Sequence, residues 1–215
     1  MKIAVIGATG FVGTNLVNEF TGRNHEVTAI SRNPGTAAQG NVKPVKADVF
    51  DTYGLAEAIS GHDVVVSAYN PGWQNPEIYD DFINGSKSIQ EAVKKAGVPR
   101  YITIGGAGSL YLAPGLQAVD TDTFPQEYKA GASAARDYLN IIKEEKELNW
   151  TFFSPAFEMH QGITTGRTGK YRLGVDHPVF DSNRRSILSG EDLAVVIADE
   201  VENPKHHKKR FTAAY

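Results

Sequence analysis

The sequence predicts an α/β fold in which a doubly wound parallel sheet of six to seven strands carries helices on both faces. Short apolar runs alternate with amphipathic runs along most of the chain, which is the pattern of parallel strands joined by crossover helices. Residues 63–68 contain three consecutive valines, and a continuous apolar run favours a central strand covered on both sides. A glycine-rich turn follows the first apolar run and opens the first amphipathic run. These elements suit one domain over residues 1–215.

The element bounds follow from periodicity and from capping residues. Strands are expected at residues 3–6, 25–30, 42–47, 63–68, 101–104, 150–153 and 210–214, with a weaker signal at 170–172. Helices are expected at residues 11–20, 52–60, 77–96, 126–148 and 193–201. Thr52 and Ser189 are the expected N-caps of the second and last helices, and Gly97 ends the third. Residues 110–125 and 156–185 lack a period, so we expect loops there, the second an irregular loop on the substrate side.

The composition is that of an ordinary globular protein, with 41% hydrophobic and 22% charged residues. The net charge of −3 offers no basic excess, so no nucleic-acid partner is expected. The chain contains no cysteine, which excludes disulfides, thiolate chemistry and cysteine metal sites, and we predict no bound metal. No apolar run approaches membrane-spanning length, and a strand follows Met1-Lys2 without room for a signal peptide. We therefore expect a cytoplasmic protein without a membrane partner.

The glycine-rich turn carries the main functional prediction. It reads Gly7-Ala8-Thr9-Gly10-Phe11-Val12-Gly13 and lies between a strand and a helix. In this setting one glycine allows the tight turn, a second lets the backbone approach a phosphate, and a third lets the helix pack closely on the strand. Thr9 lies at the helix start, and the N–H groups around Gly10, Phe11 and Val12 should meet a pyrophosphate. The turn thus predicts a Rossmann-type dinucleotide site, the alternative being a purely structural glycine turn.

The end of the second strand bears on which dinucleotide binds. NAD enzymes usually place an acidic residue here, roughly 20 residues past the glycine loop, to bind the ribose hydroxyls. This chain instead reads Ile30-Ser31-Arg32-Asn33, without a carboxylate. Arg32 can pair with a 2′-phosphate through its planar guanidinium, so we favour NADP(H) over NAD(H). Alternatively, Arg32 is a solvated charge that stacks on adenine, and either cofactor is accepted.

The glycine loop also resembles the Gly-Ala-Thr-Gly-x-x-Gly loop of the atypical short-chain dehydrogenase/reductase families. Three further segments are similar to the branch of NAD(P)H-binding proteins and NADH-flavin reductases, to which biliverdin reductase B and the NmrA-like regulators are looser relatives. These segments are Trp150-Thr151-Phe152-Phe153-Ser154-Pro155, Gly166-Arg167-Thr168-Gly169-Lys170-Tyr171-Arg172 and Ser189-Gly190-Glu191-Asp192-Leu193-Ala194. The resemblance spans nearly the whole chain, and it implies the fold and the cofactor class but no substrate.

The resemblance also implies roles for several single residues. It makes Asp48 the acid that contacts adenine, and it places the backbone at Ser67 and Ala68 along the ribose. It puts Ser109 at the rough position of the family's catalytic serine. From the residues alone, Asp48 is equally a capping or turn aspartate, and Ser109 is equally a turn residue of a glycine-rich loop.

The usual catalytic pair of these enzymes is incomplete in this sequence. Active short-chain dehydrogenases carry Tyr-x-x-x-Lys on the helix after the fifth strand, where the lysine lowers the pKa of the tyrosine. Here Tyr128 is present, but the lysine position is Ala132, and Lys129 lies about 100° around the helix from Tyr128. A flavin or a quinone accepts hydride into a conjugated ring and can take its proton from solvent. The missing lysine therefore fits such a reductase, and it fits equally a protein that binds the dinucleotide without chemistry.

We therefore predict an NAD(P)H-dependent reductase that transfers hydride to a flavin, a quinone or a similar conjugated acceptor, with FMN or FAD among the candidates. The alternatives are a non-catalytic NADP(H)-binding redox sensor of the NmrA type and an epimerase or isomerase. The catalytic candidates are Ser109, Tyr128 and His160, although His160 is equally a polar loop residue. Loop residues expected to line a substrate slot, or merely to cover the sheet end, are Tyr69, Asn70, Trp73, Ser109, Tyr111, Phe157, His160 and Arg167.

Two basic features and the quaternary state complete the predictions. Arg167 is a candidate ligand for a substrate phosphate such as that of FMN, or else a solvated charge. Residues 206–210 read His-His-Lys-Lys-Arg. Adjacent histidines point to opposite faces of an extended chain and their lysine neighbours repel a cation, so we interpret this segment as a solvated basic turn and not as a metal site. A homodimer is left open.

Overall fold

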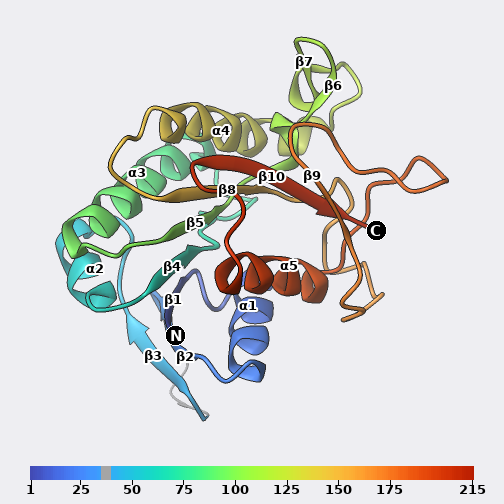
Figure 1. The fold of residues 1–215 in the computed structure, drawn as a ribbon. Helices are drawn as coiled ribbons and strands as arrows, with labels where there is room; N and C mark the ends of the chain where they lie inside the picture. The colour runs from blue at the N-terminus through green and yellow to red at the C-terminus, as the bar shows by residue number, and fades with distance from the viewer. Residues whose placement is uncertain (35–39) are drawn as a thin grey trace.

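The computed structural model describes residues 1–34 and 40–215, and an eight-stranded sheet forms its centre (Figure 1). In chain order the strands are β1 (Lys2–Ile6), β2 (Glu26–Ser31), β3 (Val42–Lys46), β4 (Val64–Ser67), β5 (Tyr101–Ile104), β8 (Trp150–Ser154), β9 (Arg172–Gly174) and β10 (Lys209–Ala214). Their order across the sheet is β3-β2-β1-β4-β5-β8-β10-β9. All neighbouring strands are parallel except β10 and β9, which are antiparallel.

The expected count of six to seven strands was too low. The weak signal at residues 170–172 corresponds to β9, which lies two residues further on and forms the sheet edge beyond β10. The strand is only three residues long, so its short apolar pattern did not stand out from the surrounding loop. The predicted doubly wound α/β fold is otherwise confirmed.

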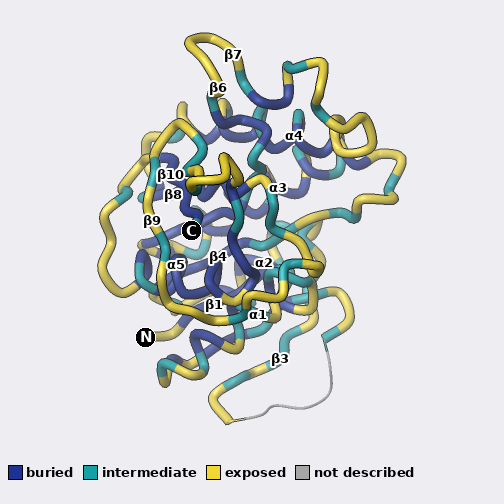
Figure 2. Tube along the Cα trace, turned by 90° about the vertical axis from the view of Figure 1, so that its right-hand side faces the viewer, coloured by how far each residue is buried: buried dark blue, intermediate teal, exposed yellow. Residues whose placement is uncertain are grey.

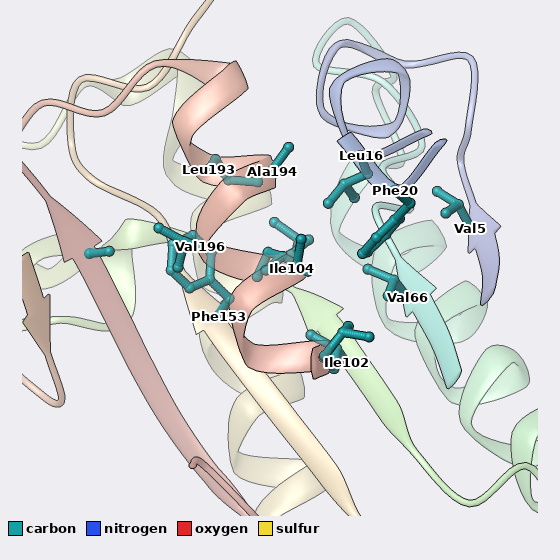
Figure 3. Close-up of a cluster of buried hydrophobic side chains, with 14 of the residues drawn as sticks. Val5, Leu16, Phe20, Val66, Ile102, Ile104, Phe153, Leu193, Ala194 and Val196 are labelled. Carbon is teal, nitrogen blue, oxygen red and sulfur yellow. The ribbon is translucent and has the colours of Figure 1, made fainter. Parts of the chain in front are cut away.

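Helices cover both faces of the sheet (Figure 1). They are α1 (Phe11–Gly22), α2 (Thr52–Ile59), α3 (Ile78–Ala96), α4 (Gln126–Lys143) and α5 (Gly190–Glu202). Side chains of β1 alternate between the faces, so Ile3 and Val5 join the core under α1 and α5, whereas Ala4 and Ile6 join the core under α2, α3 and α4. Figure 3 shows the first core, where Phe20 of α1 packs among apolar side chains of α5 and the strands. In the described part of the chain, no helix is both long and apolar enough to cross a membrane.

Local side-chain bonds explain where the helix bounds differ from those expected. Helix α4 ends at Lys143 instead of 148 because the Glu145 carboxylate accepts hydrogen bonds from the N–H groups of Glu147 (2.6 Å) and Leu148 (3.4 Å), which fold that segment into a turn. Asp51, not Thr52, caps α2, since its carboxylate accepts from the N–H of Gly54 at 3.0 Å. Ser189 caps α5 as expected, accepting from the N–H of Asp192 at 3.0 Å.

Two long segments leave the compact body. Within the expected loop at residues 110–125, β6 (Tyr111–Ala113) and β7 (Leu116–Gln117) form a small antiparallel hairpin that projects from the sheet (Figure 1). Residues 156–185 are irregular apart from β9, and they are largely exposed (Figure 2).

Candidate functional site

The glycine loop joins β1 to α1 through a conformation that requires glycine. Gly7 has φ +78°, and its N–H donates to the carbonyl of Ile30 at 3.0 Å. A Cβ atom at Gly7 would lie only 2.7 Å from the carbonyl oxygen of Ala68. The loop is therefore pressed between the ends of β2 and β4, where no side chain fits.

The start of α1 packs directly on this loop. A Cβ atom at Gly13 would lie 2.0 Å from the carbonyl oxygen of Gly7, which no real structure tolerates. Gly10 is the N-cap of α1, and no side chain caps the helix there. The first turn of α1 contains no acidic residue, so its N–H groups, including those of Phe11 and Val12, face an environment that favours an anion. We call the turn from Gly7 to Gly13 the cradle. A dinucleotide pyrophosphate fits it because its glycines leave the backbone free of side chains where the phosphates would approach.

Ser67 and Ala68, which the resemblance places along the cofactor ribose, lie at the carboxyl end of β4. Ser67 is buried at the end of β4, and the N–H of Ala68 donates to the carbonyl of Ile6 at 2.9 Å. Ala68, the residue after β4, therefore lies against Gly7. Thr9, between Gly7 and Gly10, is exposed at the tip of the loop.

A cleft lies next to the cradle, at the ends of β2, β3 and β4. It is lined by Arg32, Asp48, Val49, Phe50, Tyr69, Pro71, Asn75 and Asp81. Arg32 is exposed there, and the neighbouring hydroxyl Oγ of Ser31 is buried without a hydrogen-bond partner in the described structure. One carboxylate oxygen of Asp48 accepts from the N–H of Phe50 at 3.0 Å, so Asp48 does form a turn while lining the cleft. The structure therefore unites Arg32 and Asp48 in one cleft, at the adenosine end expected for this fold.

Tyr69 forms a wall of this cleft, although the sequence placed it in a substrate slot. Its ring stacks on Phe82 (6.2 Å, 25°), and its hydroxyl donates to the carbonyl of Asp81 at 3.0 Å. Gly85 of α3 makes room for the ring, since a Cβ there would lie 2.5 Å from it. Burial, followed by the nearby Asp81, raises the pKa of Tyr69 to about 12. Tyr69 is thus a neutral, fixed wall.

The three catalytic candidates do not form a common cluster. Ser109 is fully buried, with its Oγ 3.3 Å from the Oγ of Ser154, so it does not line an open slot as expected. His160 is exposed, and its Nδ1 accepts from the N–H of Gly162 at 3.1 Å. Tyr128, 46% exposed on the first turn of α4, packs its ring against Trp73. Each candidate therefore contacts different neighbours.

The lysine position of the usual catalytic pair faces the protein interior. Ala132 is buried, and its Cβ lies 3.0 Å from where a Cβ of Gly108 would stand. Gly108 belongs to a short 3₁₀ turn (Ala107–Ser109) that packs on α4. A long side chain at position 132 would therefore displace this turn.

Arg167 is a surface arginine with a 55% exposed side chain, and it forms an ion pair with α1. Its guanidinium donates two hydrogen bonds to the carboxylate of Glu19 on α1, at 2.7 and 2.9 Å. Hydrogen bonding from Arg167 is the main cause that lowers the pKa of Glu19. Burial of the carboxylate acts in the opposite direction, and Arg23 lowers the pKa further. The arginine therefore fastens the loop to α1.

The basic segment at residues 206–210 is only partly solvated, which corrects the expectation for it. The Nδ1 atom of His206 lies 2.7 Å from a carboxylate oxygen of Glu200, and its ring stacks on Phe211 with centroids 4.1 Å apart. Arg210 is buried, where its Nε donates to Asp176 at 3.0 Å. The partners of His206 lie on α5 and β10, the two elements that this segment joins, whereas Asp176 lies 34 residues before Arg210.

The sequence also gave no sign that Asp192 is a structural hub. It is fully buried and accepts hydrogen bonds from the N–H groups of Thr168 (2.9 Å) and Gly169 (2.7 Å) and from the hydroxyl of Tyr215 (2.8 Å). The sequence identifies Asp192 as the last residue of the capping box, but it does not indicate which groups bind its carboxylate. Asp192 thus joins the irregular loop and the last described residue to α5.

Known proteins share this architecture over the full chain. YwnB of Bacillus subtilis, described as an uncharacterized protein, is 34% identical over 99% of this chain and 97% of its own length. A solved structure from Bacteroides thetaiotaomicron, described as a "putative epimerase", is 45% identical with a TM-score of 0.91, covering 100% of this chain and 96% of that one. One from Streptococcus pneumoniae, described as a "putative NADH-flavin reductase", is 34% identical with a TM-score of 0.86, covering 100% and 99%.

The sequence profile of the family described as NAD(P)H-binding matches residues 7–204, from the first glycine of the cradle to just beyond α5. The match includes the cradle, the cleft at Arg32 and the irregular loop. Because the profile spans most of the chain and agrees with its fold, the protein belongs to the NAD(P)H-binding family of atypical short-chain dehydrogenases/reductases.

Proposed function

We propose that the protein is an NAD(P)H-dependent reductase that transfers hydride to a planar conjugated acceptor such as a flavin or a quinone. The observation that carries the proposal is the combination of a bare glycine cradle after β1 with a buried alanine, Ala132, at the lysine position of α4. A tyrosine without that lysine lacks the usual means of lowering its pKa, so alcohol chemistry by the common route is disfavoured. Hydride transfer to a conjugated ring does not need a tyrosine of lowered pKa, because water can supply the proton.

In this proposal, some residues of the chain bind the dinucleotide and others orient the acceptor against its nicotinamide ring. The cradle would hold the pyrophosphate, and the cleft at Arg32 would hold the adenosine end. When bound, the reduced nicotinamide supplies a hydride to the acceptor and is itself oxidised, while water supplies the proton that completes the reduction. The protein then has to align two flat rings and limit water between them.

The cofactor is proposed to be NADP(H) in preference to NAD(H). Arg32 is exposed at the end of β2, and the unpartnered hydroxyl of Ser31 stands next to it in the chain. A 2′-phosphate would offer acceptors to both groups, whereas a free 2′-hydroxyl would leave the guanidinium without an anion. The proposal also includes a cytoplasmic location without nucleic-acid or membrane partners. A homodimer is one quaternary state that it allows.

The direct test is oxidation of NADPH by the purified protein, with FMN, FAD, riboflavin and a naphthoquinone as acceptors. We expect loss of the nicotinamide absorbance with at least one acceptor and none without protein. Tight NADPH binding without turnover on the whole panel would contradict the reductase and favour the redox-sensor alternative.

Replacing Arg32 by alanine tests the cofactor assignment. Loss of a charge-assisted hydrogen bond should raise the Kd for NADPH by about 10- to 100-fold, while the Kd for NADH changes little. Lys46→Ala, at the end of neighbouring β3, is the matched control for a lost surface charge. Equal weakening of NADPH and NADH by Arg32→Ala would count against a 2′-phosphate contact. Both constants can be measured by calorimetry.

An epimerase is the second candidate, because the 45% identical structure from Bacteroides thetaiotaomicron is described as a "putative epimerase". Epimerisation needs an acid and a base on opposite sides of a carbon, and the three candidates here do not cluster. Exchange of deuterium from water into a nucleotide sugar, without net cofactor oxidation, would support this candidate against the reductase.

A further inference from the structure

Two large aromatic side chains stand half exposed at the carboxyl edge of the sheet. Trp73 is 54% exposed and Tyr128 is 46% exposed, and their rings meet edge to face with centroids 5.3 Å apart and planes at 83°. Trp73 lies in the segment between β4 and α3, and Tyr128 lies on the first turn of α4. Because the two planes are nearly perpendicular, the pair offers one exposed aromatic face with the second ring standing beside it as a side wall. An exposed aromatic face of this kind is a common means of binding a flat ligand.

The neighbouring backbone is shaped to seat the indole. A Cβ atom at Gly131 would lie 2.8 Å from Cζ3 of Trp73 and 2.9 Å from Cδ1 of Ile78, so the indole rests on α4 where a side chain is missing. Gly72, just before the indole, has φ +110°, which only glycine adopts readily. The indole is therefore held on one side by fixed contacts, while about half of its surface stays open.

The segment that carries Trp73 also borders the nucleotide cleft. Tyr69, Pro71 and Asn75 line the cleft together with Arg32, whereas Trp73 turns the other way to reach α4. In this fold a dinucleotide extends along the carboxyl ends of the strands across the point where the strand order reverses. The aromatic pair thus lies beyond β4, on the side of β5 and α4, opposite the end marked by Arg32.

We propose that a planar acceptor stacks on the exposed indole of Trp73 with the ring of Tyr128 at its side, and that Tyr128 acts there through its ring and not through its hydroxyl. This inference rests on the proposed reductase function and names the acceptor subsite. Stacking selects flat conjugated rings with little regard for their substituents, so flavins and quinones fit and saturated alcohols do not. Another exposed pair, Phe157 and Phe180 (6.2 Å, 52°), belongs to the irregular loop after β8 and lacks the shared segment with the nucleotide cleft.

Riboflavin binding provides a readout that needs no turnover. Equilibrium dialysis gives the Kd, and flavin emission reports stacking, since an indole in contact with the flavin quenches it. The chain contains two tryptophans, and Trp150 is 2% exposed, so its own emission reports whether a Trp73 variant remains folded. We expect Trp73→Leu to raise the Kd for riboflavin by about tenfold. The bound flavin should also recover emission, while Trp73→Phe retains most of the affinity.

Two tyrosine variants separate the ring from the hydroxyl. Tyr128→Phe keeps the ring and should bind riboflavin with the Kd of the wild type, whereas Tyr128→Ala removes the ring and should raise both that Kd and the KM for the acceptor. Tyr53→Leu on α2 is the control, because Tyr53 is a 72% exposed aromatic residue outside the pair. Loss of kcat in Tyr128→Phe with unchanged riboflavin binding would overturn the proposal and make the hydroxyl catalytic.

The outcomes also distinguish the two proposals. Riboflavin binding that depends on Trp73, without NADPH oxidation by any acceptor, would reject the reductase and retain the subsite. Turnover by wild type with an unchanged Kd and KM in Trp73→Leu would retain the reductase and reject the subsite. If no planar acceptor binds the wild-type protein, the subsite is rejected as well.

Discussion

The glycine cradle and the irregular loop at residues 156–185 are held in place by different means. In the cradle, backbone meets backbone: Gly7 and Gly13 approach neighbouring carbonyl groups more closely than any side chain allows. In the loop, side chains from distant helices hold the chain, with Asp192 of α5 binding Thr168 and Gly169 and with Glu19 of α1 binding Arg167. The first kind of constraint leaves a short sequence pattern, whereas the second leaves none.

Substituting Gly13 by valine should break the cradle and gives the largest expected effect. The Cβ atom would lie 2.0 Å from the Gly7 carbonyl oxygen, so α1 must shift away from the loop that would bind the phosphates. We expect NADPH to stop raising the melting temperature, since a ligand stabilises only the state that binds it. The measurement is a thermal shift with and without NADPH.

Gly22→Ala, on the same helix, is the matched control. A Cβ atom at Gly22 would meet nothing within 4 Å. Alanine should stabilise the helix by up to about 0.5–1 kcal/mol and leave the NADPH shift intact. A valine at position 13 that still binds NADPH normally would disprove the role of the cradle.

Asp192→Ala should loosen the irregular loop and spare the cradle. The change removes the acceptor for Thr168, Gly169 and Tyr215, and we expect a loss of about 2 kcal/mol in the free energy of unfolding. Urea titration measures the loss, and limited proteolysis should cut faster within residues 156–185. NADPH affinity should stay unchanged.

The neighbouring Glu191→Gln is the control, because Glu191 is exposed in the same first turn of α5. It should alter stability by a few tenths of a kcal/mol at most. If Asp192→Ala abolished NADPH binding without unfolding the protein, the two regions would not be separable.

Glu19→Gln should give a smaller effect, which depends on pH. The Arg167 hydrogen bond, and then Arg23, hold the pKa of Glu19 below its ordinary value of 4.5 in the folded protein. The stabilisation is therefore complete above that value and is lost as the pH falls through the lower folded pKa. Wild type should lose about 1 kcal/mol more than Glu19→Gln on acidification from about pH 5 to 3, measured by urea unfolding.

Glu158→Gln serves as the comparison for this test. Arg185 lowers the pKa of Glu158 in the same direction, but the Glu158 side chain is 34% exposed against 8% for Glu19. Solvent screens the exposed pair, so the difference from wild type should be smaller. An equal difference from wild type at both sites would show that the burial of Glu19 does not increase the contribution of its ion pair to the free energy of unfolding.

Periodicity and capping predicted the five α-helices and the seven longer strands of the main sheet, because the hydrophobic pattern of each of these elements is present in its own residues. They did not predict the two short 3₁₀ helices at Ala107–Ser109 and Ala118–Asp120. The three-residue β9 and the β6–β7 hairpin carried too little pattern to be assigned with the same clarity. The residues from Gly7 to Gly13, which the spacing predicts to bind the cofactor, form the turn between β1 and α1, with Ala68 against Gly7. Ser109 was misplaced since its burial depends on Ser154 and Arg210, which are 45 and 101 residues away.

By itself, the sequence determined the parallel α/β fold and the glycine cradle, because strand periodicity and the absence of a Cβ atom act locally on the backbone. Only the tertiary structure decided that Arg167 binds Glu19, that Asp192 holds the loop, and that Trp73 meets Tyr128 at the carboxyl edge. Those contacts join residues that are far apart in sequence. Their partners follow from how helices pack on the sheet, which no short pattern records.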